Sequence, residues 1–153
     1  MGKRYKRILI VDANYYKDIS SHLMVGVKKV LEKYEFKIDE IDHIKVTGAL
    51  EIPQAMNFIL PRSIGNITDY LGAIGIGCVI KGETSHYEIV SHLSAKGLMD
   101  VSLKYNIPIT NGILTVDNYN QALERAMPDK KDRGGHAASA LMSLINLNLK
   151  INN

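Results

Sequence analysis

Apolar positions along the 153-residue chain form short continuous runs that alternate with longer segments of helical period. Residues 8–11 and 71–80 form runs of the kind found in strands that are buried on both faces of a parallel sheet. Residues 38–46 and 107–115 predict two more strands, of which the first is more polar and edge-like. The pattern therefore predicts four strands.

Between these runs, apolar residues recur every three or four positions, which predicts helices. The first is expected to begin with Ser20 or Ser21 as its N-cap and to run to about Tyr34, and the second carries Pro53 in its first turn and runs to about Leu60. Residues 61–69 are rich in Pro, Ser, Gly and Asn and predict a loop. Three further helices are expected over residues 85–105, 118–126 and 134–149.

Alternating strands and helices predict an α/β fold, a doubly wound, four-stranded parallel sheet with helices on both faces and flavodoxin-like layering. The chain length fits a single domain over residues 1–153, in which residues 1–6 are expected to be a flexible N-terminal arm. Ligands bind at the carboxyl ends of the strands in such sheets. The residues that follow each strand are therefore the candidates for chemistry.

Composition narrows the functional classes. Apolar residues make up 46% and charged residues 23%, a balance typical of a globular protein. The net charge of +3 is too mild to indicate a nucleic-acid partner, and the apolar runs are too short to indicate a membrane partner. Cys78 is the only cysteine, which favours a cytoplasmic protein. Metal-ligand spacings and glycine motifs for nucleotides are absent from the sequence, so we expect no metal site.

The turn over residues 81–86 is the first candidate site, because it follows a strand and opens a helix. Free backbone N–H groups at such a turn can bind phosphate, and the hydroxyl of Thr84 adds a donor. His86 lies beside this turn and is the candidate for proton transfer. Two alternatives stay open: the turn can be only a tight connection, and His86 only a capping or surface histidine.

Three other positions are candidates with open alternatives. Tyr15 can stack on a planar ring or pack over the sheet edge, and Glu51 can accept hydrogen bonds from a polyol or only favour a helix N-terminus. Arg125 and Arg133 can grip phosphate or belong to a solvated face. The histidines at positions 22, 43 and 92 are expected to be ordinary surface or interface residues.

In their order and spacing, residues 48–53, 79–87, 112–115 and 121–126 resemble the lumazine synthases, and the likeness covers nearly the whole chain. The resemblance implies condensation of 5-amino-6-(D-ribitylamino)uracil with 3,4-dihydroxy-2-butanone 4-phosphate to 6,7-dimethyl-8-ribityllumazine, a transferase reaction that is the penultimate step of riboflavin biosynthesis and uses no cofactor. A non-catalytic flavin or lumazine binder on the same fold is the alternative. A signalling receiver domain is disfavoured, because no aspartate follows the second predicted strand.

The resemblance also implies a role for each site residue. His86 would transfer protons, and phosphate would be held by Glu83, Thr84 and Arg125. The pyrimidine and its ribityl chain would be held by Tyr15, Ala49, Leu50, Glu51, Cys78, Val79, Ile80, Asn111 and Arg133. Four positions depart from the usual family residue: the family commonly has phenylalanine in place of Tyr15, an aromatic from across a subunit boundary in place of Asn111, lysine in place of Arg133, and often an acidic residue in place of His136.

Family members assemble as pentamers or as hollow shells of sixty subunits, so the resemblance implies a homo-oligomer that acts on small molecules. The arm before Ile8 is short, and residues 127–133 lack a compact glycine-rich turn. Both features favour a free pentamer over a shell.

Overall fold

The computed structural model describes residues 5–63 and 68–153, in which strands and helices alternate. The elements are β1 (Tyr5–Ala13), α1 (Lys17–Lys33), a 3-10 turn η1 (Ile38–Glu40), β2 (Ile41–Val46), α2 (Glu51–Ser63), β3 (Thr68–Ile80), α3 (His86–Tyr105), β4 (Ile109–Val116), α4 (Tyr119–Ala126) and α5 (Arg133–Asn152).

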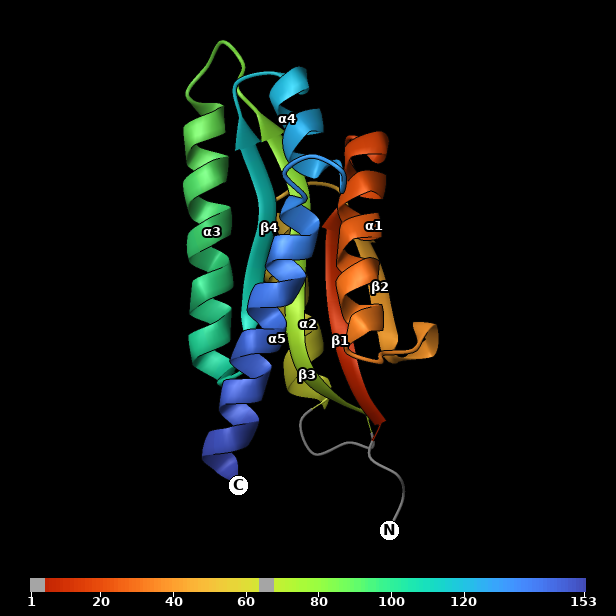
Figure 1. The fold of residues 1–153 in the computed structure, drawn as a ribbon. Helices are drawn as coiled ribbons and strands as arrows, with labels where there is room; N and C mark the ends of the chain where they lie inside the picture. The colour runs from red at the N-terminus through yellow and green to blue at the C-terminus, as the bar shows by residue number, and fades with distance from the viewer. Residues whose placement is uncertain (1–4, 64–67) are drawn as a thin grey trace.

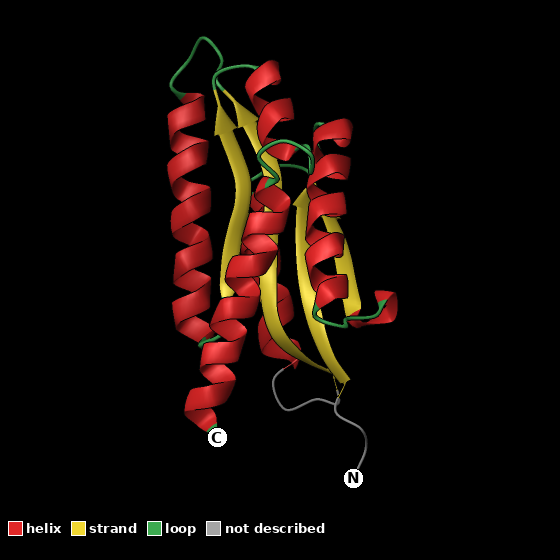
Figure 2. Ribbon diagram, in the orientation of Figure 1, coloured by secondary structure: helices red, strands yellow, loops and turns green. Residues whose placement is uncertain are grey.

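The four strands form one sheet in the order β2-β1-β3-β4, and every pairing is parallel. Figure 2 shows the arrowheads of β1, β3 and β4 at the same end of the molecule. β1 and β3 are central, which leaves β2 and β4 as the two edge strands. The predicted doubly wound parallel sheet is thereby confirmed.

Helices cover both faces of the sheet because the side chains of β1 and β3 alternate between two apolar cores. Ile8 and Ile10 pack with side chains of α1, α4 and α5, whereas Leu9 and Val11 pack with those of α2 and α3. All four side chains have no exposed surface, as expected of a central strand in a parallel sheet. In Figure 1, α1 and α5 lie in front of the sheet and α2 lies behind it.

Two glycines allow the helices on each face to approach closely. A Cβ atom on Gly134 of α5 would collide with the backbone carbonyl of Leu23 in α1. On the other face, a Cβ atom on Gly97 of α3 would lie 2.7 Å from Cγ of Pro53 in α2. Larger residues at these positions would push the helix pairs apart.

The start of α1 differs from the prediction, which placed an N-cap at Ser20 or Ser21. The helix begins at Lys17 after Tyr16, which makes no side-chain cap. The hydroxyl of Ser20 donates to Oδ1 of Asp12 at 2.8 Å, and that of Ser21 donates to the carbonyl of Lys17 at 2.9 Å. The capping prediction was wrong because both hydroxyls have other partners.

Other boundaries also shift. α2 continues through Pro61 to Ser63, which the loop prediction missed; the proline lies in the last three residues and removes only one helical hydrogen bond. β3 begins at Thr68, so residues 68–69 are strand, and residues 64–67 of the predicted loop lie outside the described residues. Residues 38–40 form η1 instead of strand, because the backbone N–H of Lys37 donates to the carboxylate of Glu40.

At the N-terminus, β1 includes Tyr5 and Lys6, which pair with Thr68 and Asp69 of β3. These two residues of the expected arm therefore belong to the sheet. Residues 1–4 lie outside the described residues.

Candidate functional site

The carboxyl ends of all four strands meet at one edge of the sheet, which we call the rim. β1, β2, β3 and β4 end at Ala13, Val46, Ile80 and Val116, and each is followed by a short connection to a helix. The segments after β2, β1 and β3 are neighbours along the rim, because these strands are neighbours in the sheet. Most of the candidate residues from the sequence lie on these three segments.

Tyr15 follows β1 and offers a free aromatic ring. Its side chain is 75% exposed, and its ring meets that of Tyr16 edge to face, with centroids 4.9 Å apart and planes at 79°. Tyr16 is half-buried against the α1 core, and burial raises the pKa of its hydroxyl. Tyr16 thus supports Tyr15 and leaves a face of the Tyr15 ring open for stacking.

The turn from β3 to α3 has the geometry of an anion site. Ser85 precedes α3 without a side-chain cap, and nothing lies within 4 Å of a Cβ built on Gly82. The oxygen of the Thr84 hydroxyl accepts weakly from the N–H of His86 at 3.3 Å, so its own proton can be donated outward. Open N–H groups at the start of a 20-residue helix favour a negatively charged ligand.

His86 is the first residue of α3, and its side chain is exposed at this turn. The sequence therefore placed the histidine beside the turn correctly. Glu83 is exposed as well. A histidine in this position can deliver or accept a proton next to a bound anion.

The connection from β2 to α2 presents one carboxylate. Ala49 and Leu50 pack against the core formed with α2 and α3, which fixes the turn. Glu51 begins α2 with an exposed side chain, and its Oε2 atom lies 2.9 Å from a Cβ built on Gly48. A larger residue than Gly48 would displace this carboxylate, which is exposed and can accept hydrogen bonds from hydroxyl groups.

The end of β3 points its side chains to alternate faces of the sheet. Cys78 and Ile80 pack on the face of α1 and α5, and Val79 packs on the face of α2 and α3. Burial, aided by the charge of Asp18, raises the pKa of the Cys78 thiol to about 11. The thiol is thus neutral at physiological pH and serves as an apolar wall, and the three residues cannot all line one side of a ligand.

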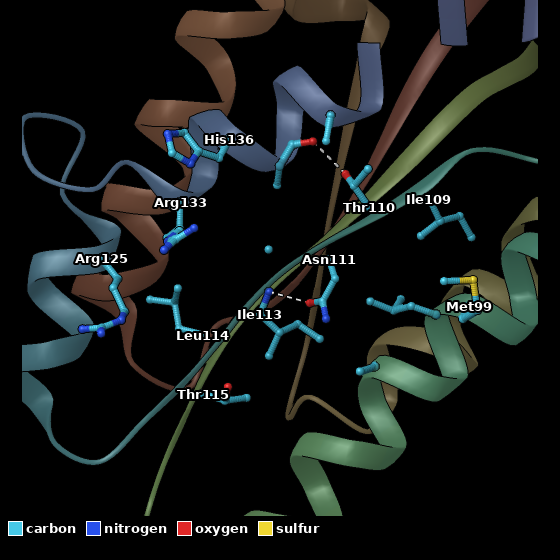
Figure 3. A pocket seen from close by; sticks show the side chains of 15 residues that line it. Met99, Ile109, Thr110, Asn111, Ile113, Leu114, Thr115, Arg125, Arg133 and His136 are labelled. Atoms are coloured by element: carbon cyan, nitrogen blue, oxygen red, sulfur yellow. Dashed lines mark hydrogen bonds between the residues drawn. The ribbon is translucent and has the colours of Figure 1, made fainter. Parts of the chain in front are cut away.

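A groove of about 690 Å³ runs along the free edge of β4, and we call it the β4 groove. β4 forms its floor from Ile109 to Thr115, α3 contributes Met99 to one wall, and α4 and α5 contribute the other wall (Figure 3). Figure 3 shows Arg125, Arg133 and His136 on the same side of β4, with Met99 on the opposite side.

The β4 groove is cationic. Nη1 of Arg125 donates to the carbonyl of Gln121 at 3.2 Å, and it lies 3.9 Å from the carboxylate of Glu124. Arg133 opens α5, and its guanidinium faces the groove together with the ring of His136. No aspartate or glutamate is among the described residues that line the groove. Such a surface suits the phosphate group of a ligand.

Asn111 lies in the floor of the groove, where its Oδ1 atom accepts the N–H of Ile113 at 2.8 Å (Figure 3). The amide is therefore turned along its own strand. Of the predicted site residues, the groove gathers Asn111, Arg125 and Arg133, and its described lining includes none of the candidates from the rim. The structure thus brings the candidates together in two sets.

Sequence reasoning missed several residues of the groove. Met99, Thr110 and the small residues of α5 line it. His136 faces it as well, although sequence reasoning assigned no role to that residue. Thr110 donates to the carbonyl of Ala137 at 2.8 Å, which fixes α5 against β4. These residues can be recognised only once β4 is known to be an edge strand. No local sequence motif indicates that β4 has this position.

Two structural tests bear on the classes of function. Across residues 5–63 and 68–153, no group of three or more metal-binding side chains is gathered. In the same ranges, none of the helices is both long enough and apolar enough to cross a membrane.

Comparison with known proteins gives a consistent family. Residues 5–148 match the family model described as 6,7-dimethyl-8-ribityllumazine synthase. The enzyme of that name from Afipia carboxidovorans is 43% identical over 145 residues, which cover 95% of this chain and 87% of the relative. The one from Bartonella tribocorum is 43% identical over 145 residues, covering 95% and 91%. The one from Agrobacterium fabrum is 42% identical over 144 residues, covering 94% and 95%.

Proposed function

The chain belongs to the 6,7-dimethyl-8-ribityllumazine synthase family, and we propose that the rim of one subunit and the β4 groove of a neighbouring copy form its active site. The protein is a transferase of riboflavin biosynthesis. It condenses 5-amino-6-(D-ribitylamino)uracil with 3,4-dihydroxy-2-butanone 4-phosphate and releases 6,7-dimethyl-8-ribityllumazine and phosphate. The proposal of a shared site rests on one observation. Within one chain, the predicted site residues lie in two separate places, the rim and the β4 groove.

The rim holds the pyrimidine. The exposed ring of Tyr15 stacks on the heterocycle, and the outward carboxylate of Glu51 accepts hydrogen bonds from the ribityl hydroxyls. Ala49 and Leu50 hold the turn that positions Glu51. Residues 78–80, at the end of β3, contribute their backbone. Their side chains contribute on alternate faces of the sheet.

The phosphate of the second substrate lies between the turn after β3 and the β4 groove. Thr84 and the open N–H groups at the start of α3 donate to it, with the side chain of Glu83 turned away. Arg125 supplies a guanidinium that can bind two phosphate oxygens at once, and Arg133 adds a second positive charge. Asn111, in the floor of the groove, lies beside the pyrimidine ring.

His86 moves the protons of the condensation. The primary amine of the uracil adds to the ketone, and loss of water gives an imine. Removal of a proton from the neighbouring carbon then expels phosphate, which the cationic side chains stabilise as it leaves. Loss of phosphate leaves an enol at the hydroxyl-bearing carbon, and a proton transfer to the terminal carbon converts this enol to a ketone. The ribitylamino nitrogen finally closes the ring on that ketone, and a second water leaves. Each step is an addition, an elimination or a proton transfer, so the route needs no cofactor.

We further propose a homo-oligomer, with a free pentamer favoured over a shell of sixty subunits. β4 is an edge strand, so its outer hydrogen-bonding groups have no partner strand within the described chain. The helix beside it, α3, exposes an apolar stripe at helical spacing, where Ile89, Leu93, Met99 and Leu103 are 52–74% exposed. Apolar side chains exposed in a row on one helix indicate contact with another protein surface.

The chain also fits one domain in the cytoplasm. Both cores share a single sheet, and the free Cys78 thiol suits a reducing compartment. Small molecules are its partners, and the mild net charge gives no support for nucleic acid as a partner.

Turnover tests the proposal directly. Both substrates are mixed with the purified protein, and the absorbance of the lumazine is followed for wild type, His86→Ala and His92→Ala. We expect His86→Ala to lose about 100-fold or more in kcat, because it removes the proton carrier. His92 is an exposed histidine on the same helix and serves as the matched control, with activity retained.

Two results would contradict the proposal. If wild type does not exceed the spontaneous rate but binds the product, the protein is a lumazine binder and not the enzyme. If His86→Ala keeps full activity, another group transfers the protons.

A further inference from the structure

A second polar groove lies between α1 and β2, far from the β4 edge in the order of the sheet. Its volume is about 480 Å³, within the range of small-molecule sites. α1 contributes Lys17, Ser20, Ser21 and Lys28, and β2 contributes His43 and Lys45. We call it the α1–β2 groove. None of the residues assigned above to catalysis or substrate binding lines it.

A buried carboxylate organises one wall of this groove. Asp12 is 1% exposed at the end of β1. Its Oδ1 atom accepts the hydroxyl of Ser20 at 2.8 Å, and its Oδ2 atom lies 2.9 Å from Nε2 of His43. Both carboxylate oxygens therefore have a partner, and neither forms an ion pair with a lysine of the groove.

The three lysines of the groove have no acidic partner in the part of the chain that the structure describes. Lys28 is half-buried and has Glu32 one helical turn away, yet the two form no ion pair. On α3, by contrast, Lys96 pairs with Asp100 at the same spacing. Positive charges that gather in one groove repel each other, and an anion bound among them relieves the repulsion.

The donors that remain in the groove suit an anion. The hydroxyl protons of Ser20 and Ser21 are already donated, to Asp12 and to the carbonyl of Lys17. The imidazole of His43 is likewise engaged, because its Nε2 atom lies on Asp12. The ammonium groups are thus the main donors, and they match the charge of a phosphate. The buried Met24 and the exposed Val25 add an apolar part to the lining, where carbon atoms of an organic phosphate can pack.

We propose that the α1–β2 groove binds a phosphate-bearing small molecule, at a site separate from the one that holds the substrate phosphate. Lys17, Lys28 and Lys45 bind the phosphate, and the hydrogen-bonded group of Asp12, Ser20 and His43 forms the fixed wall between them. The proposal does not depend on the assignment of the active site, because the two sets of residues have no member in common.

Protection of lysines from acetylation tests this site in the assembled protein. Wild type is treated briefly with an acetylating reagent, with and without inorganic pyrophosphate, and the modification of each lysine is read from peptide masses. Glycerol 3-phosphate in a parallel arm tests the organic phosphate. We expect either compound to slow modification of Lys17, Lys28 and Lys45 by about threefold or more, since bound phosphate occupies their donors.

Lys29 and Lys33 are exposed lysines of the same helix outside the groove, and their rates should not change. Sodium chloride at equal ionic strength replaces pyrophosphate in a control for screening. Lys28→Ala should weaken the protection of Lys17 and Lys45, whereas Arg125→Ala should leave it intact. Equal rates with and without pyrophosphate, or equal slowing of Lys29 and Lys33, would overturn the proposal.

Discussion

The two edge strands of the sheet differ in what their side chains contact. At β2, the carboxylate of Asp42 accepts hydrogen bonds from Nε and Nη2 of Arg7 in β1 and from the hydroxyl of Tyr70 in β3. At β4, the side chain of Asn111 bonds only along its own strand, and a cationic groove with an apolar helix beside it lies open. The side chain of Asp42 is thus bonded to β1 and β3, whereas that of Asn111 leaves the groove beside it open. The stabilising cluster and the proposed assembly surface therefore lie at opposite edges of the sheet.

The charges at the two edges differ in the same way. Bonds from Arg7, partly offset by burial, lower the pKa of Asp42, and burial together with Asp42 raises the pKa of Tyr70. The charges of Arg7 and Asp42 are thus matched within the chain. In the β4 groove, no carboxylate is among the described lining residues, and Arg125 has only the longer contact of 3.9 Å with Glu124 outside the lining.

Arg125→Ala is expected to have the largest effect on function. Loss of the guanidinium should lower kcat/KM by about 100-fold, because the negative charge on the departing phosphate is no longer stabilised. Stability should not change, since the side chain is partly exposed and makes one hydrogen bond of 3.2 Å. Steady-state kinetics and urea unfolding measure the two effects. Lys130→Ala, an exposed lysine in the next loop, is the control, and an equal loss there would contradict the role of Arg125.

Asp42→Ala should have the opposite profile. It leaves the guanidinium of Arg7 and the hydroxyl of Tyr70 without their shared acceptor, which should cost about 2 kcal/mol of unfolding free energy. Activity per folded molecule should stay at the wild-type level. Asp39→Ala is the control, because the hydrogen bond from Arg7 to Asp39 goes to the backbone carbonyl, which the substitution keeps. If urea midpoints of the two variants agree, the hydrogen bonds to Asp42 do not stabilise the sheet.

Substitutions of Tyr15 test the role of the rim, and their expected effect on activity is smaller. Tyr15→Ala should raise KM for the uracil substrate by about tenfold, because a stacking face is lost. Tyr15→Phe keeps that face and should change KM by less than about twofold. Initial rates at varied uracil substrate distinguish the two. Equal effects of both variants would assign the role to the hydroxyl instead of the ring.

The smallest effect is a pH dependence of stability that belongs to Asp42. Its pKa is lower in the folded protein than in the unfolded chain, so its contribution is present above the unfolded value of about 4 and is lost as pH falls through the folded value. The difference in unfolding free energy between wild type and Asp42→Asn should therefore shrink as pH falls below about 4. If this difference in unfolding free energy is constant with pH, the charge of Asp42 does not stabilise the folded protein.

Much of the fold could be predicted because it rests on local patterns. The continuous apolar run at residues 8–11 identifies a central strand, and the spacing of Leu23, Val27 and Leu31 identifies the buried face of α1. The start of α1 could not be predicted, because the hydroxyl of Ser20 is taken by Asp12, eight residues earlier. A serine hydroxyl can cap a helix or make a tertiary hydrogen bond, so the residue type alone does not distinguish the two roles.

The site shows the same limit. His86 and Thr84 follow a strand directly, so their place at the rim could be read from sequence. The β4 groove requires the order of strands and the placement of α5, which depend on contacts between Thr110 and Ala137 and between Gly134 and Leu23. His43 was expected to be an ordinary surface or interface residue, yet it pairs with Asp12 from 31 positions away. Long-range pairing of this kind leaves no local signal.

The central claim is that the rim of one copy and the β4 groove of another complete one site, and mixed assemblies test it most directly. His86→Ala and Arg125→Ala chains are co-expressed with different affinity tags, and assemblies that contain both are isolated by two successive purifications. In a shared site, about a quarter of the boundaries pair an intact His86 with an intact Arg125, so activity should return to about a quarter of the wild-type value. If each site lies within one chain, every site keeps one defect, and activity that stays at the level of the single variants would contradict the claim.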